Sequence, residues 1–185
     1  LIHDEVDGIK MTDDQIKSHV GIMFTAGSST THDSLGNILY ALLSIRDNWE
    51  KVKTYPELRP LAIEEALRWE SAVSMLPRMS NKETDIEFGG VTIKANTFVM
   101  CGICGANHDP SVFNDPHEYK IGRKVEKMMT FGPGPRMCPG MHLARKELSI
   151  IIDLLIETFP NLHLTDIAKS QPCGTIFRST QQLVC

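Results

Sequence analysis

Phe131-Gly132-Pro133-Gly134-Pro135-Arg136-Met137-Cys138-Pro139-Gly140 is the most informative stretch of this chain. It carries a single cysteine near its end, and the amphipathic run from Met141 to Thr158 that follows it predicts a helix. The first turn of a helix offers free N–H groups and a positive dipole end, so this position, together with Arg136, favours an ionised sulfur on Cys138. Such a thiolate is either a nucleophile or a metal ligand, and a lone buried thiol is the alternative.

A long helix is predicted well before this loop. Thr12-Asp13-Asp14-Gln15 is a capping box, in which the threonine hydroxyl and the glutamine side chain bond each other's backbone N–H groups. Apolar residues then recur at helical spacing to about Ile45, which predicts a helix of more than thirty residues. Its middle, residues 25–31, is rich in hydroxyls that can bond backbone carbonyls and bend or widen the helix. Packing or a functional site must therefore hold this segment.

The remaining patterns predict one more long helix and several short strands. A helix over about residues 57–70 places Glu65 and Arg68 one turn apart. Gly89-Gly90 is a two-residue hairpin signal. Strands are expected at 86–88, 91–93, 97–101, 162–164 and 182–184, after an exposed lead-in over residues 1–11. The predicted fold class is mainly α with small β-sheets.

Composition excludes disordered, collagen-like and low-complexity classes, because 42% of the 185 residues are hydrophobic and 23% are charged. No stretch approaches eighteen uninterrupted apolar residues, so we expect no membrane span. The five cysteines are an odd number with no apolar leader before them, which favours free thiols in a reducing, cytoplasmic setting. No feature indicates nucleic-acid binding.

Positive charge is concentrated around the cysteine loop. Seven basic residues and one acid, Glu126, lie between Lys120 and Lys146. The basic residues are Lys120, Arg123, Lys124, Lys127, Arg136, Arg145 and Lys146. This cluster is either a docking patch or a solvated face without a partner.

Residues 131–145 resemble the haem-binding loop of the cytochromes P-450, the haem-thiolate monooxygenases. The pattern Phe-x-x-Gly-x-Arg-x-Cys-x-Gly, followed by Leu143-Ala144-Arg145, matches at every fixed position. Glu65-Ala66-Leu67-Arg68 resembles the Glu-x-x-Arg of that family's K helix, and residues 26–31 resemble the oxygen-activating segment of its I helix. The three motifs occur in the family's order.

The resemblance implies that residues 1–185 are the C-terminal haem-binding part of a single cytochrome P-450 domain of the soluble bacterial type. This part would contain the long I helix, the K helix, the cysteine loop and the L helix. The N-terminal part, which completes the substrate pocket in the family, has no counterpart here. We expect this chain alone to be inactive.

The resemblance also implies which residues would hold the cofactor, haem b. Cys138 would be the proximal ligand of the iron. Arg136 and Arg78 would each meet a haem propionate, for which a guanidinium is well suited. The remaining cofactor contacts would be Phe131, which shields the sulfur from water, and Gly134 and Gly140, which allow close backbone approach.

Proton delivery and substrate contact would fall to other segments. Where the family usually has an acid before the I-helix threonine, this chain has Ser29, so protons would move through Thr30, Ser29 and waters without a nearby carboxylate. The substrate pocket would be lined by Ala26, Val73, Ser74, Met75, Leu76, Ile176 and Phe177.

Glu65 and Arg68 would then form a structural ion pair. In the family an arginine from Pro-x-Arg-Phe joins this pair, but the corresponding residues here are Pro116-His117-Glu118-Tyr119. Arg123 is the candidate replacement.

Cys101-Gly102-Ile103-Cys104 resembles a zinc or redox pair, because two thiols three residues apart can share a metal or form a disulfide. The sequence contains no second pair, and only His108 is nearby. We therefore expect two structural thiols.

The expected function is that of a haem-thiolate monooxygenase, which inserts one oxygen atom from O2 into a small organic substrate. Electrons would come from a ferredoxin-type donor and its NAD(P)H-dependent reductase. Two alternatives remain: a haem-thiolate peroxygenase or peroxidase using H2O2, which the serine at position 29 suggests, and a non-catalytic haem- or zinc-binding fragment.

Overall fold

The computed structural model describes residues 5–185, so residues 1–4 of the expected lead-in lie outside the described part. The helices are α1 (Asp13–Leu43), α2 (Arg46–Thr54), α3 (Leu58–Trp69), α4 (Ile103–Asn107) and α5 (Met141–Thr158). The strands are β1 (Glu5–Val6), β2 (Ile9–Lys10), β3 (Met75–Met79), β4 (Ile86–Phe88), β5 (Val91–Ile93), β6 (Phe98–Gly102), β7 (Pro172–Cys173) and β8 (Ser179–Thr180). The predicted fold class, mainly α with small sheets, is confirmed.

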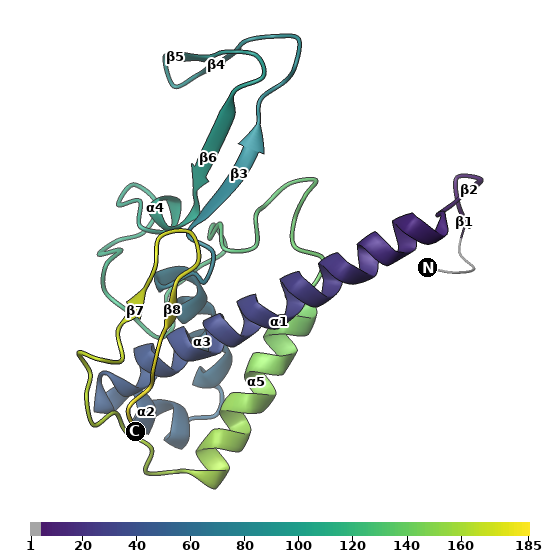
Figure 1. The fold of residues 1–185 in the computed structure, drawn as a ribbon. Helices are drawn as coiled ribbons and strands as arrows, with labels where there is room; N and C mark the ends of the chain where they lie inside the picture. The colour runs from purple at the N-terminus through teal and green to yellow at the C-terminus, as the bar shows by residue number, and fades with distance from the viewer. Residues whose placement is uncertain (1–4) are drawn as a thin grey trace.

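Helix α1 is a long arm whose two halves differ in environment (Figure 1). The predicted capping box is present, with the Gln15 backbone N–H donating to Thr12 Oγ1 at 3.3 Å. The C-terminal half packs into the body, whereas the N-terminal half projects away from it and exposes side chains such as Phe24. The helix remains α-helical through residues 25–31, so the hydroxyl run does not break it.

The hydrophobic core lies where four helices meet. Its fully buried members include Ile38 of α1, Trp49 of α2, Ala66 of α3, and Leu148 and Ile152 of α5. Leu148 and Ile152 are four residues apart, so α5 presents one apolar face to the core, whereas the end of α1 is buried at every position from Asn37 to Leu43. The core fixes α3 and the start of α5 relative to the end of α1.

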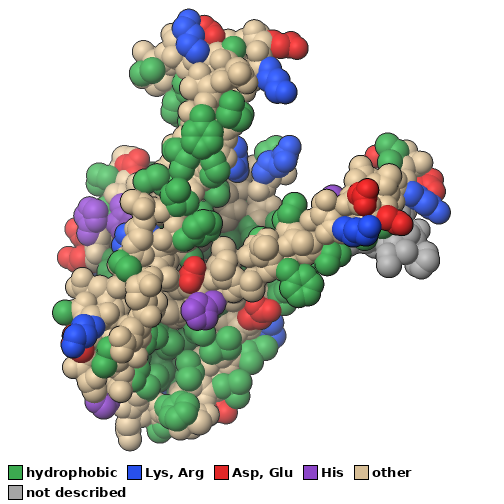
Figure 2. Space-filling view, in the orientation of Figure 1, with side chains coloured by type: hydrophobic (Ala, Val, Ile, Leu, Met, Phe, Trp, Pro, Cys, Tyr) green, Lys and Arg blue, Asp and Glu red, His purple; other side chains and the backbone are tan. Residues whose placement is uncertain are grey.

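A two-stranded ribbon, β3 paired with β6, projects from this body and ends in the hairpin β4–β5 (Figure 1). The predicted hairpin is confirmed: Gly89 and Gly90 have φ values of 57° and 78°, the left-handed conformation that the turn requires. Hydrophobic side chains run along the exposed ribbon in Figure 2. Met79 of β3 and Phe98 of β6 are both largely exposed.

Several elements differ from the sequence-based expectation. The strands expected at 162–164 and 182–184 are wrong, because Leu162, Leu164 and Leu183 pack against the core without forming a ladder. Only one backbone bond, from Thr165 N–H to the Val184 carbonyl at 2.7 Å, links these segments. Strands β7 and β8 pair nearby instead. Helices α2 and α4 and strand β3 were not expected.

Within residues 5–185, every helix is too short or too polar to cross a membrane.

Candidate functional site

The cysteine loop connects the end of the irregular segment to helix α5. Gly132 and Gly134 have φ values of 65° and 105°, a conformation that L side chains rarely adopt. The Cys138 N–H donates to the Phe131 carbonyl at 2.9 Å, which folds the loop back on itself. Cys138 is a free, exposed thiol three residues before the first residue of α5.

The start of α5 is suited to an anionic neighbour. Gly140 is the N-cap and makes no side-chain capping bond, and the first turn contains no acidic residue. A Cβ built on Gly140 would lie 3.9 Å from Cys138 Sγ, so the sulfur lies beside the helix terminus. A thiolate at this position supplies the negative charge that the helix does not carry itself.

The ring of Phe131 packs against an ion pair formed by Arg145 and Glu64. The Arg145 guanidinium is 4.6 Å from the Phe131 ring centroid. Arg145 also binds Glu64 of α3 through two hydrogen bonds of 2.6 and 2.8 Å. These contacts fix the ring and tie α5 to α3. A neighbouring cavity of about 440 Å³ is lined by Glu64 and Arg145, by residues 122–126 and by loop residues 131–133.

Strand β3 packs against the loop, because a Cβ on Gly132 would meet Leu76 Cδ1 at 3.5 Å. Arg78 is two residues further on β3 and therefore points to the same side of the ribbon as Leu76. Its guanidinium is exposed and donates to the Pro77 carbonyl at 2.8 Å. Arg136 is exposed on the loop itself.

A haem fits the chemistry of these residues. The group needs one thiolate donor and cations for its propionates. Cys138 is an accessible thiol at an uncapped helix end. Among residues 5–185, neither Arg78 nor Arg136 takes part in an ion pair, so both guanidinium groups can receive a carboxylate.

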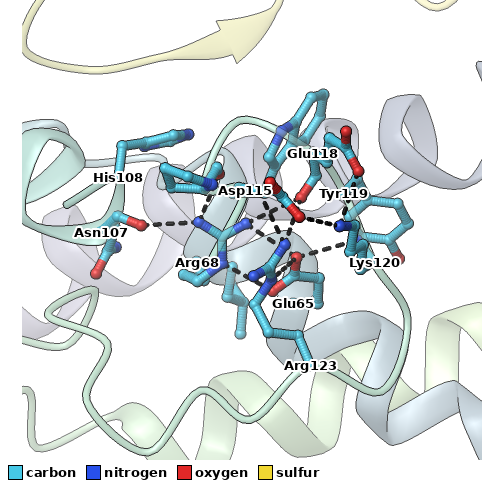
Figure 3. A network of polar contacts seen from close by, with 12 residues as sticks. Glu65, Arg68, Asn107, His108, Asp115, Glu118, Tyr119, Lys120 and Arg123 are labelled. Carbon is cyan, nitrogen blue, oxygen red and sulfur yellow. Dashed lines mark hydrogen bonds and ion pairs between the residues drawn. The ribbon is translucent and has the colours of Figure 1, made fainter. Parts of the chain in front are cut away.

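A buried charge network joins α3 to residues 107–123 (Figure 3). Glu65 and Arg68 are both fully buried, and Arg68 binds the Glu65 carboxylate through Nε at 2.8 Å and Nη2 at 2.9 Å. The rest of the Arg68 guanidinium donates to the carbonyls of Asn107 and Pro116. No donor of this guanidinium is left without a partner.

Arg123 occupies the third position in this network. Its Nε donates to Glu65 Oε1 at 2.8 Å, and its side chain is 10% exposed. The Lys120 backbone N–H donates to the same carboxylate oxygen at 3.0 Å. Residues 114–123 are thereby fixed to α3. The sequence-based suggestion that Arg123 replaces the missing arginine agrees with this geometry.

The hydroxyl run of α1 bonds to its own helix. Thr30 Oγ1 donates to the Ala26 carbonyl at 2.7 Å, and Ser29 Oγ donates to the Thr25 carbonyl at 3.3 Å. The expectation of no nearby carboxylate stays a prediction: within residues 5–185 the hydrogen-bond partners of Ser29 and Thr30 are backbone carbonyls, and Asp33 Oδ1 lies 3.4 Å from His32 Nδ1. Asp33 lies four residues after Ser29, on the same helix face, and its side chain is only 18% exposed.

Two of the three predicted pocket segments lie side by side. Val73 forms an isolated antiparallel bridge with Phe177, and the Ser74 N–H donates to the Ile176 carbonyl at 2.9 Å. Ser74 is buried, and its hydroxyl donates to the Thr175 carbonyl. Ile176 and Phe177 expose 45% and 59% of their surface. The third segment, Ala26 and Thr30, lies in the middle of α1, where Ala26 is exposed and Thr30 is partly buried.

Cys101 and Cys104 are both free thiols. Burial raises the pKa of the Cys104 thiol, and the negative charge of Glu70 adds to the shift. Within residues 5–185 no group of three or more His, Cys, Asp or Glu side chains could hold a metal ion, so no further ligand accompanies this pair there.

The basic cluster is smaller than the sequence suggests. Lys120 pairs with Asp115 and Glu118, while Arg123 and Arg145 pair with the glutamates of α3. Within this cluster, the exposed basic side chains that form no ion pair with any residue of the described part are Lys124, Lys127, Arg136 and Lys146.

Comparisons with known proteins agree with this arrangement. The family model for cytochrome P-450 matches residues 57–180. The chain is 35% identical to the steroid C26-monooxygenase of Mycolicibacterium smegmatis over 91% of its length, and 34% identical to the biotin biosynthesis cytochrome P-450 of Bacillus subtilis over 85%. Over 99% of its length, this chain has the same fold as the crystal structure of CYP109E1 from Bacillus megaterium in complex with testosterone. The TM-score is 0.92 and the sequence identity is 31%.

The match covers only part of each of these proteins. The chain spans 41% of the steroid C26-monooxygenase, 39% of the biotin biosynthesis protein and 51% of the CYP109E1 chain.

Proposed function

Because this chain belongs to the cytochrome P-450 family, we propose that the full-length protein is a haem-thiolate monooxygenase and that residues 1–185 are its haem-binding part. The observation that carries the proposal is the position of the free Cys138 thiol. It follows two glycines with positive φ and lies beside the N-terminus of α5, whose first turn contains no acidic residue. When bound there, haem supplies the activation of dioxygen, and a thiolate ligand favours O–O cleavage.

Each residue of the loop has a separate task in this proposal. Cys138 Sγ is the only protein ligand to the iron. Phe131, held by Arg145, keeps water from the sulfur. Arg136 and Arg78 neutralise the propionates, because two carboxylates entering an apolar slot need paired charges. Gly134 and Gly140 leave the backbone free to approach the ring.

Proton transfer is assigned to α1. Thr30 Oγ1 and Ser29 Oγ hold and pass protons, and their present bonds to helix carbonyls can be exchanged for bonds to water. Asp33, one turn further along the same face, is the carboxylate that supplies them.

The substrate is a small, mostly apolar organic molecule. Leu76, Met75, Ile176 and Phe177 supply the apolar contact surface, and Ala26 and Val73 complete it together with Ser74. The relatives named above include a steroid monooxygenase and a structure with testosterone, so testosterone is a reasonable first probe.

The proposal is tested on the full-length protein by the absorption spectrum of the reduced, carbon-monoxide-bound state. A thiolate-ligated haem gives a strongly red-shifted Soret band. We expect this band at one equivalent of haem per chain. A haem protein without the shifted band would contradict thiolate ligation, and a protein that binds no haem would remove the proposed function altogether.

The electron donor is an acidic iron–sulfur protein of the ferredoxin type, served by an NAD(P)H-dependent reductase. Lys124, Lys127 and Lys146 are exposed, form no ion pair within residues 5–185, and flank the cysteine loop in the sequence. Positive charge near the proximal ligand attracts an acidic partner and raises the rate of encounter more than it raises affinity.

Reduction of the haem by such a ferredoxin is expected to slow about tenfold in each of three single variants, Lys124→Glu, Lys127→Glu and Lys146→Glu. It is also expected to slow with rising ionic strength. Stopped-flow absorption measures the rate. Lys82→Glu makes the same charge change in the segment leading to the ribbon tip and should leave the rate unchanged. Rates indifferent to salt and to all three reversals would contradict the docking site, and turnover with H2O2 but no ferredoxin response would favour a peroxygenase.

A further inference from the structure

A polar cluster of Asn37, Glu70 and Arg178 joins the three segments that carry the pocket residues. Glu70 is the C-cap residue of α3 and leads into Val73–Leu76. Arg178 directly follows Ile176 and Phe177, and Asn37 lies two turns after Thr30 on the same face of α1. Sequence patterns did not single out any of the three residues.

The ion pair between Glu70 and Arg178 is the centre of this cluster. Arg178 Nε lies 2.5 Å from Glu70 Oε1, and Nη2 lies 3.2 Å from Oε2. The side chains are 30% and 15% exposed, so the pair is partly shielded from solvent. A two-bond contact between guanidinium and carboxylate fixes orientation as well as distance. The pair therefore holds residue 178 in one position relative to the end of α3.

The same arginine also shapes the turn that precedes it. Its Nη1 donates to the Gly174 carbonyl at 2.8 Å, and Nη2 is 3.4 Å from the Pro172 carbonyl. Gly174 has a φ of 112°, and a side chain there would collide with the Phe177 carbonyl. The turn is thus closed around the guanidinium, with Ile176 and Phe177 left exposed at its tip.

Asn37 adds α1 to this arrangement. Its Nδ2 donates to the Glu70 carbonyl at 3.2 Å and to the Arg178 carbonyl at 3.0 Å, and the residue is 1% exposed. One side chain thus bonds both partners of the ion pair. The Arg178 N–H donates in turn to the Ala72 carbonyl at 2.9 Å.

We propose that Glu70 and Arg178, aligned by Asn37, are positioning residues that hold the Ile176–Phe177 turn against Val73–Leu76 and so set the shape of the substrate pocket. The inference rests on the proposed function, because it assigns the pocket to the same haem site. None of the three residues reaches the substrate. They act through the turn, and their loss should change which ligands fit without changing how the haem is ligated.

The test compares two ligands of the full-length haem protein that bind iron through the same nitrogen. Imidazole is too small to reach the turn, whereas 1-dodecylimidazole carries an apolar chain that needs the pocket wall. In Glu70→Ala and in Arg178→Ala we expect the affinity for 1-dodecylimidazole to fall about tenfold, with the imidazole affinity and the reduced carbon-monoxide spectrum unchanged. The double variant should lose no more than Arg178→Ala alone, because that single change already removes the ion pair together with the bonds to the turn carbonyls.

Two controls separate positioning from general stability. Asp153→Ala breaks the Arg59–Asp153 ion pair between α3 and α5, at the opposite end of α3 from Glu70, and should leave the ratio of the two affinities unchanged. Exchanging the charges in Glu70→Arg/Arg178→Glu should restore part of the lost affinity. Equal losses for both ligands, or no loss for either, would overturn the proposal.

Hydrogen exchange separates this inference from the proposed function, because it needs no haem. The amides of Ser74 and Arg178 bond across the two segments, and they should exchange faster in Arg178→Ala than in the unaltered protein. If the protein bound no haem but these amides were deprotected, the proposed function would fail while the tether remained. If exchange were unchanged, the positioning role would be wrong whatever the spectrum.

Discussion

Replacing Cys138 by serine is expected to abolish the red-shifted Soret band of the reduced, carbon-monoxide-bound full-length protein. A serine hydroxyl stays protonated near neutral pH and cannot supply the electron density of a thiolate to the iron. The rest of the loop should keep its shape, because the Cys138 N–H bond to the Phe131 carbonyl involves only the backbone. The absorption spectrum and the haem content, measured together, distinguish a changed ligand from a lost cofactor.

Cys101→Ser and Cys173→Ser are the matched controls, since both residues are exposed free thiols. Neither variant should alter the band. A Cys138→Ser protein that retained the thiolate spectrum would show that the ligand assignment is wrong. Loss of the spectrum in the Cys101 variant would instead point to the Cys-x-x-Cys pair.

Features encoded over a few residues were the ones the sequence predicted well. The capping box at Thr12 and the Gly89-Gly90 turn lie at the expected places, because each depends only on immediate neighbours. The cysteine loop is similar, since its glycines and the helix after it are adjacent in the chain. Local chemistry therefore predicted the centre of the candidate site.

Features that depend on distant partners were missed or misplaced. Helix α2 has nine residues, too few for its periodicity to stand out, and it is held by the burial of Trp49 and Val52 against other helices. Leu162 and Leu164 alternate with polar residues as in a strand, yet their side chains pack against the helical core instead of forming part of a sheet. The Glu70–Arg178 pair joins residues 108 positions apart, and no local pattern signals it.

Arg123 is an intermediate case between these two groups. The family resemblance predicts an arginine beside the Glu65–Arg68 pair, and because residues 116–119 contain none, Arg123, the next arginine along the chain, is the candidate. Only the structure shows why it reaches: the segment from Asn114 to Arg123 folds back over α3, and the Lys120 N–H and Arg123 Nε converge on one carboxylate oxygen. The family motif indicated that an arginine belongs at this place, and the fold of residues 114–123 determines which one reaches it.

Glu65→Ala is expected to destabilise the protein by about 3–5 kcal/mol, a large fraction of the stability of a typical domain. The change leaves the Arg68 guanidinium fully buried without its counter-charge, and it removes an acceptor from Arg123 and from the Lys120 N–H. Urea unfolding of the full-length protein measures the free energy of unfolding. A protein too unstable to purify would agree with this expectation.

Arg123→Ala and Glu64→Ala are the comparison variants, because both remove one partner of an ion pair that is less buried than Glu65–Arg68. Arg123 is 10% exposed rather than fully buried, so its loss should cost less than the loss of Glu65. Glu64, the residue before Glu65 on α3, also binds an arginine through two hydrogen bonds, but its side chain is 25% exposed and solvent can replace the partner. Its removal should cost about 1 kcal/mol or less. If Glu64→Ala were as damaging as Glu65→Ala, burial of the charge would not be the reason that the network matters.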